Sequence, residues 1–171
     1  LYRVTGDDAV LARAVACGRH IPADGRAGWP GVAGRALAGQ SHGAAGIVQA
    51  LAALAAATGA AGFAETARQG IAFENRLFDA GRGNWPDLRR PDRITFPVQW
   101  CHGATGIGFG RLSVPGLPDD GAAARDLDHA IACTCDTADG GRDNLCCGQA
   151  GRLSLLIQAA RARGDDALMR L

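Results

Sequence analysis

The sequence predicts an all-α protein built as a toroid or solenoid of paired helices. Three observations support this fold class. Val, Ile, Thr, Tyr and Phe do not gather in alternating runs, so no segment predicts a β-strand. Helical periodicity covers most of the chain, with Gly and Pro between the segments. A similar glycine-rich turn also opens three of the segments, which indicates repeated helical hairpins.

The expected helices follow one another along the chain. They cover residues 7–19, 43–57, 62–79, 103–112, 122–134, 149–163 and 165–171. Each end of the chain lies inside a helical pattern and carries neither a cap nor a polar tail. We therefore expect one partial domain over residues 1–171, truncated at both ends.

Composition narrows the class of protein. A length of 171 residues suits one domain with its own core, and a net charge of +1 does not favour a nucleic-acid binder. Residues 36–64 lack charged side chains but are mostly Ala and Gly, which predicts a buried helix and no membrane span. No secretory signal is visible at the start. These features predict a cytoplasmic protein.

The three turns share a pattern of His or Cys, Gly, two residues and Gly. They are SHGAAGI (41–47), CHGATGI (101–107) and CCGQAGR (146–152). Close packing between helices is enough to explain the glycines. It does not explain why His or Cys precedes the first glycine each time.

Cysteine and histidine residues in these turns predict a metal centre. If the turns share one end of the helical array, Cys101, Cys146 and Cys147 converge, with His42 and His102 nearby. Zinc prefers tetrahedral sulfur and nitrogen ligands, and catalytic sites use three protein ligands. Helix N-termini also stabilise thiolates. The residues alone leave an alternative open, because vicinal cysteines are often buried free thiols and no CxxC pair is present.

The remaining cysteines are expected to have no role in this centre. Cys133 and Cys135 are two apart in an expected helix and so face different ways, which makes joint ligation unfavourable and predicts small buried or free thiols. Cys17 is expected on the core face of its helix. Trp100 is expected to pack beneath the metal centre and to orient Cys101.

The motifs resemble those of the LanC-like cyclase family, the lanthionine synthetases. GQSHGAAG (39–46) fits the family's GxxHGxxG motif and WCHGATGI (100–107) its WCxGxxG motif. LCCGQAG (145–151) fits the CCG form of its third motif. FENRLFDAGRGNWPDLR (73–89) resembles a stretch of the fused, two-function LanM synthetases. That likeness implies fusion to an N-terminal dehydratase domain.

The resemblance implies a fold, a reaction and a set of residues. The fold is an α/α toroid, a double ring of helical hairpins that is incomplete in this chain. The reaction adds a cysteine thiolate of a dehydrated precursor peptide to dehydroalanine or dehydrobutyrine, which forms the thioether rings of a lantibiotic. By motif, the Zn²⁺ ligands are Cys101, Cys146 and Cys147, and the acid/base residue is His42. His102, where the family often has tyrosine, is a second candidate for proton transfer.

Two departures from the family pattern limit what carries over. Pro97 stands where single-function members often have an arginine, so no arginine role transfers. The family's upstream aspartate motif would precede residue 1.

A basic loop precedes the second motif. It contains Arg89, Arg90 and Arg93, with Asp87 and Asp92 as expected salt-bridge partners. The loop is expected either to be simply solvated or to contact an acidic precursor peptide.

Two other function classes remain as alternatives. The first is a non-catalytic, zinc-stabilised module that binds a cysteine-containing peptide or thiol, and such a module has no need of His42. The second is a carbohydrate-active toroid. It would require paired carboxylates at the mouth, and the three turns offer none.

Overall fold

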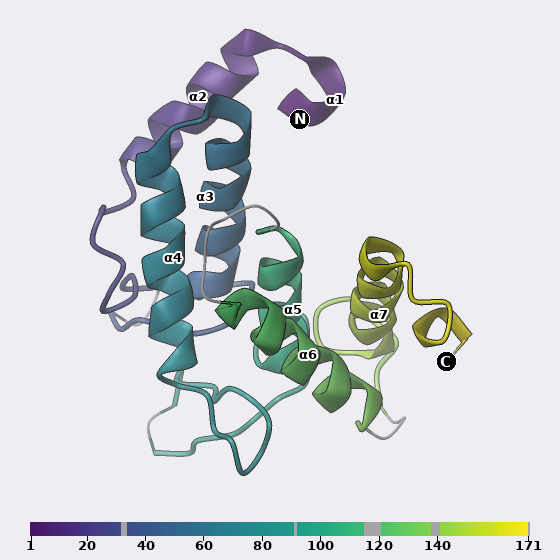
Figure 1. The fold of residues 1–171 in the computed structure, drawn as a ribbon. Coiled ribbons are helices and arrows are strands. Elements are labelled where there is room, and N and C mark those ends of the chain that lie inside the picture. Colours follow the sequence, from purple (N-terminus) through teal and green to yellow (C-terminus); the bar gives the residue numbers. More distant parts are fainter. Residues whose placement is uncertain (32–33, 91, 115–120, 138–140, 171) are drawn as a thin grey trace.

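The computed structural model describes residues 1–31, 34–90, 92–114, 121–137 and 141–170 (Figure 1). Within these ranges the regular elements are helices, and β-pairing is limited to isolated bridges. The predicted all-α class is therefore confirmed. The elements are α1 (Tyr2–Thr5), α2 (Asp8–Arg19), α3 (Ala44–Thr58), α4 (Ala61–Asn75), α5 (Ala104–Leu112), α6 (Ala122–Cys135), α7 (Gln149–Arg163) and the 3-10 turn η1 (Leu168–Arg170).

The helices form two layers (Figure 1). Helices α3, α5 and α7 make one row, because α5 packs against both of the others. Helices α4 and α6 make the second row, and they pack on α3 and α5 respectively and contact each other. Two parallel rows of hairpin-connected helices are a sector of an α/α toroid, as predicted. The glycine-rich turns precede α3, α5 and α7, so all three turns belong to the same row.

Small residues let the first row pack closely. A Cβ added at Gly110 of α5 would lie 3.0 Å from the Cβ of Ala45 in α3. Around this contact the buried side chains form three apolar clusters, with Val48, Leu51 and Ile71 in the first, Trp85 and Ile107 in the second, and Phe109, Leu127 and Leu155 in the third. The close contact holds the start of α3 against the last turn of α5.

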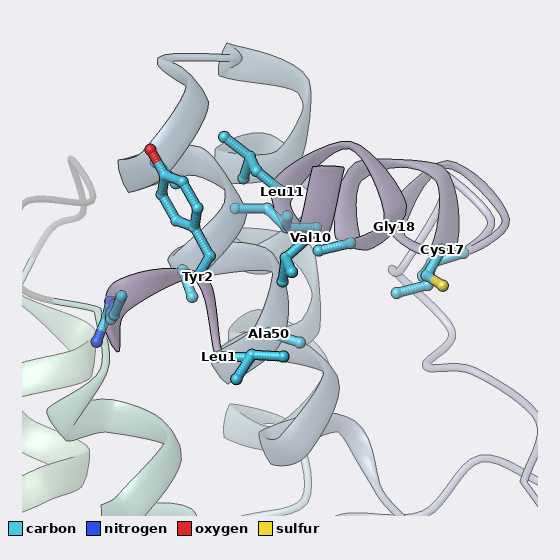
Figure 2. A pocket seen from close by; sticks show the side chains of 13 residues that line it. Leu1, Tyr2, Val10, Leu11, Cys17, Gly18 and Ala50 are labelled. Atoms are coloured by element: carbon cyan, nitrogen blue, oxygen red, sulfur yellow. The ribbon is translucent and has the colours of Figure 1, made fainter. Parts of the chain in front are cut away.

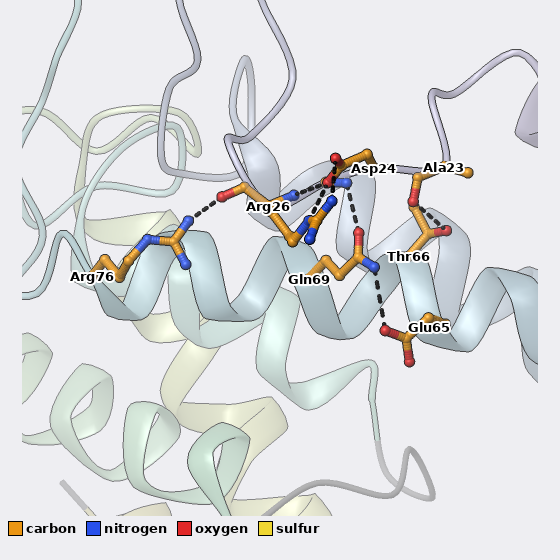
Figure 3. Close-up of polar contacts among 8 residues, drawn as sticks. Ala23, Asp24, Arg26, Glu65, Thr66, Gln69 and Arg76 are labelled. Carbon is orange, nitrogen blue, oxygen red and sulfur yellow. Dashed lines mark hydrogen bonds and ion pairs between the residues drawn. The ribbon is translucent and has the colours of Figure 1, made fainter.

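Polar contacts fasten the segment between α2 and α3 along α4 (Figure 3). The backbone N–H of Gly25 donates to Oε1 of Gln69 at 2.8 Å, and Arg76 donates to the carbonyl of Arg26. Asp24 and Arg26 pair within the segment at 2.8 Å. These contacts fix the chain that leads into the first glycine-rich turn.

An apolar cavity of about 520 Å³ lies between α1, α2 and α3 (Figure 2). Its lining includes Tyr2, Leu11, Cys17 and, from the C-terminal half of α3, Ala57. Cys17 is exposed at this cavity, so the prediction that it is a core residue was wrong. The glycine-rich turn lies at the opposite end of α3. In the part of the chain that the structure describes, no helix is long and apolar enough to cross a membrane.

Two expected helices end differently. Helix α4 ends at Asn75, not 79, because the Glu74 carbonyl accepts from the Leu77 N–H at 2.9 Å and the Trp85 indole at 3.1 Å. The helix expected over 165–171 is only the turn Leu168–Arg170, with residue 171 outside the described residues. Asp165 caps that turn by accepting from the N–H of Leu168 at 2.9 Å, and so short a turn lacks the hydrogen bonds that propagate a helix.

Candidate metal centre

The three turns meet at the starts of α3, α5 and α7. The Cys101 N–H donates to the Cys146 carbonyl at 3.2 Å, and the Cys101 carbonyl accepts from the Ser41 N–H at 3.2 Å. Residues far apart in sequence are thus joined by backbone hydrogen bonds. The structure brings together the turns that carry the predicted site residues.

The three predicted metal ligands form a cluster. Within the described residues, the Sγ atoms of Cys101, Cys146 and Cys147 are the group that can hold a metal, and all lie within 4.8 Å of one another. The Cys101–Cys147 Sγ distance is 3.7 Å and the Cys146–Cys147 distance is 3.4 Å. Tetrahedral zinc with Zn–S bonds of about 2.3 Å would place its sulfur atoms ~3.8 Å apart. The donor set and its spacing therefore fit zinc, without a disulfide among the thiols.

The cluster is open to solvent on one side. Cys101 is buried, Cys147 is half-buried and Cys146 is exposed. Burial, followed by contacts with Cys146 and Cys147, raises the pKa of Cys101 to about 12. The Cys101 thiol is therefore protonated near neutral pH unless a bound cation stabilises its thiolate. The exposed side leaves room for a further ligand.

The two predicted catalytic histidines lie side by side, with ring centroids 6.2 Å apart. His42 is exposed on the loop before α3, whereas His102 is only 1% exposed. Burial and then the Arg89 charge lower the pKa of His102, which favours a neutral ring. Its Nε2 has no hydrogen-bond partner among the residues that the structure describes. His42 is thus the solvent-accessible imidazole of the two.

Arg89, which the sequence analysis placed in the basic loop, also lies near the thiols of the centre. It pairs with Asp87 at 2.6 Å, and Arg90 pairs with Asp92 at 3.2 Å, so the predicted pairings within the loop are confirmed. Hydrogen bonds to Asp87 raise the pKa of Arg89, and Cys101 and Cys147 in their thiolate form raise it further. Arg89 therefore brings positive charge near the thiols. The Asp-x-Arg spacing was the only sequence signal, and it does not reveal this proximity.

The other residues that the sequence analysis discussed near the centre are Trp100 and the two cysteines of α6. Trp100 is half-buried and packs against Phe109, Leu127 and Leu155, which agrees with the predicted packing role. Cys133 and Cys135 lie on α6 as free thiols and are not part of the three-thiol cluster. Neither contributes to the candidate centre, as predicted.

The turn before α5 depends on Gly103. Gly103 has φ +79°, and an added Cβ would lie 1.6 Å from the Pro97 carbonyl oxygen. Gly103→Ala is expected to destabilise the fold by at least about 2 kcal/mol, because a left-handed backbone costs ~1 kcal/mol and the overlap adds to it. Gly59→Ala is the control for a positive φ without crowding. Gly59 has φ +68° and open space at its Cβ position, although its ψ is +6° and that of Gly103 is −160°.

Urea unfolding monitored by circular dichroism measures both variants. Equal losses of unfolding free energy in Gly103→Ala and Gly59→Ala would show that the overlap with Pro97 has no energetic consequence.

Fold and centre together define a sector of a helical toroid that carries a three-thiol centre beside an exposed histidine. A family model described as "Lanthionine synthetase C-like protein" matches residues 1–170. The chain belongs to this family, in agreement with the resemblance of its motifs. A comparison with curated proteins finds no match.

Proposed function

We propose that the chain is a zinc-dependent cyclase domain that forms lanthionine and methyllanthionine thioether rings in lantibiotic biosynthesis. The observation that carries this proposal is the convergence of three thiols beside His42 at the ends of three helices. Membership of the lanthionine synthetase C-like family supports it. A structural zinc site would have all four protein ligands, whereas the three thiols here leave one position for a substrate.

The proposed reaction is a Michael-type addition of a thiol across the double bond of a dehydrated residue. The peptide thiol forms a bond from its sulfur to the β-carbon of dehydroalanine or dehydrobutyrine, and a proton is added at the α-carbon. Zinc, when bound, would hold the peptide cysteine as its thiolate. Cys101, Cys146 and Cys147 would hold the zinc.

His42 would carry the proton in this addition. Its exposed imidazole can accept the proton of the incoming thiol and deliver one to the enolate that forms after the addition. His102 lies beside it as a second candidate, although its burial restricts access to substrate. The Arg89 charge would favour anionic sulfur and the enolate.

The partner in this proposal is a dehydrated precursor peptide. An N-terminal dehydratase domain, suggested by the segment 73–89, would supply the dehydrated residues. We place the reaction in the cytoplasm, because reducing conditions keep cysteine thiols available. The basic loop is a surface on which an acidic part of the precursor can lie, with Arg90 and Arg93 both exposed.

A cyclisation assay tests the proposed activity. A dehydrated peptide with one cysteine and one dehydroalanine is incubated with the chain, and free thiol is labelled with N-ethylmaleimide before mass spectrometry. Cyclisation leaves the peptide mass unchanged but removes the labelled product. The control is the same peptide incubated without protein. If the peptide is labelled to the same extent after incubation with a folded, zinc-loaded chain as in that control, the result would contradict a cyclase and favour the non-catalytic binding module.

The second cysteine of the CCG turn is expected to affect rate. Three thiolates bring one more negative charge to the centre than two thiolates and a neutral imidazole, so a bound substrate sulfur is more electron-rich. Cys147→His is expected to retain zinc and to slow cyclisation by roughly tenfold, or ~1.4 kcal/mol of barrier. Chelator competition measures zinc affinity, and the assay above measures rate. An unchanged rate with zinc retained would remove this role.

A further inference from the structure

A buried group of charged side chains lies next to the candidate centre. Arg111 of α5 is fully buried and donates from Nη1 to Glu74 Oε2 and from Nε to Asp126 Oδ2, both at 2.8 Å. Glu74 belongs to α4 and Asp126 to α6, so one guanidinium joins three helices. Two carboxylates share this single cation, and each therefore remains paired when the other is neutralised.

Glu74 alone of the two carboxylates extends to the loop that carries His42. Its Oε1 accepts from the backbone N–H of Gly39 at 3.0 Å, and the carboxylate also accepts from the backbone of Ala45. These two residues stand before and after His42 in sequence. Helix α3 has no side-chain cap of its own at Gly43, so Glu74 supplies a carboxylate from another helix at this positive helix end.

On the side away from Glu74, the same loop packs closely against the turn that contains Cys101. A Cβ added at Gly39 would lie 2.8 Å from the Cys101 carbonyl oxygen and 3.0 Å from the His102 Cα. The Ser41 N–H also donates to that carbonyl. The loop thus lies between Glu74 and the residue pair Cys101–His102.

We propose that Glu74 is a positioning residue, whose buried carboxylate fixes the loop 39–45 and thereby sets His42 against the cysteine cluster. Its hydrogen-bond partners among the described residues are Arg111 and the backbone of the loop, so it acts through the backbone. Its consequence for catalysis rests on the proposed cyclase function, whereas its consequence for the loop does not.

Two isosteric variants separate positioning from stability. Glu74→Gln removes the carboxylate that meets the loop and leaves Arg111 paired with Asp126. Asp126→Asn removes the other carboxylate and leaves Arg111 paired with Glu74. Both variants lose one buried ion-pair arm. Only Glu74→Gln affects the contact with Gly39, because a single amide oxygen replaces the two oxygens that accept from the Gly39 N–H and from Arg111 Nη1.

The four histidines report where each variant acts. In nuclear magnetic resonance spectra of the zinc-loaded chain, Glu74→Gln is expected to shift the imidazole signals of His42 and His102 and to leave His20, at the end of α2, unchanged. Asp126→Asn is expected to shift His129, whose charge acts on Asp126, and not His42. Equal changes at His42 in both variants would overturn the proposal, because Glu74 would then act only through general stability.

Amide exchange in the wild-type chain tests the contact without any variant. A Gly39 N–H bound to a buried carboxylate is expected to exchange with deuterium at least about a hundredfold more slowly than an exposed loop amide. Exchange at the rate of an exposed amide would overturn the proposal. If Glu74→Gln does not fold, this measurement still tests the contact between Glu74 and the loop.

Kinetics test the catalytic consequence. Glu74→Gln is expected to keep its zinc and to lower kcat by about tenfold or more, with KM less affected, because small displacements of catalytic groups are costly. Asp126→Asn is expected to stay within about twofold of the wild-type kcat. A wild-type chain without cyclase activity would contradict the proposed function alone, since the histidine signals and amide exchange still test Glu74. Equal kcat losses in the two variants would overturn the positioning role.

Discussion

His42→Ala is expected to retain zinc while its cyclisation rate falls by about 10²–10⁴-fold, the usual contribution of a general acid or base. His42 is exposed and is not one of the clustered sulfur ligands, so its removal leaves the metal donors in place. Its ring lies 6.2 Å from that of His102, which follows the cluster residue Cys101 directly. Elemental analysis for zinc and the thiol-labelling assay measure the two properties on the same preparation.

His20→Ala is the matched control for this variant. His20 ends α2 and is exposed, and its loss is expected to change neither zinc nor rate. An unchanged rate in His42→Ala would favour the binding module over the cyclase. Loss of zinc in His42→Ala would show instead that this histidine is a ligand.

Cys101→Ala is expected to lose both metal and activity. Cys101 is the buried member of the cluster, 3.7 Å from the Cys147 sulfur, and its backbone joins the other two turns. Removing it leaves two adjacent thiols, which are too few for a tight zinc site. Titration with Co²⁺ measures the effect, because thiolate ligation gives a strong near-ultraviolet charge-transfer absorption. The wild-type chain should show this band, and Cys101→Ala should show little of it.

A thiol outside the cluster provides the control for this loss. Cys133→Ala removes a half-buried thiol of α6 and is expected to keep both metal and activity. The double variant Cys146→Ala/Cys147→Ala should behave like Cys101→Ala. Stoichiometric metal in Cys101→Ala would mean that the cluster is not one shared site.

Local sequence patterns were enough to predict the starts of the helices near the centre. The expected segments 43–57, 103–112 and 149–163 correspond to α3, α5 and α7 within one residue at each end. Glycine at the turn fixes where each of these helices begins. The convergence of Cys101, Cys146 and Cys147 was predicted from the repeat, since equivalent turns of a helical array share one end.

The sequence patterns did not predict contacts between segments that are far apart in the sequence. Arg89 and Glu74 look like ordinary charged residues of a loop and a helix end, and only the folded chain brings them to the turns. Cys17 was misassigned for a similar reason, because the periodicity of α2 gives a face but not what covers it. The end of α4 is likewise set by Trp85, ten residues after Asn75.

Zinc content of the purified wild-type chain tests the central claim most directly. Elemental analysis after exhaustive dialysis against metal-free buffer is expected to find about one zinc per chain, because the three thiols form a single site. The same analysis of Cys101→Ala is expected to find almost none. A folded wild-type chain that retains no zinc, even after incubation with added Zn²⁺ under reducing conditions, would contradict the proposed metal centre and the cyclase mechanism built on it.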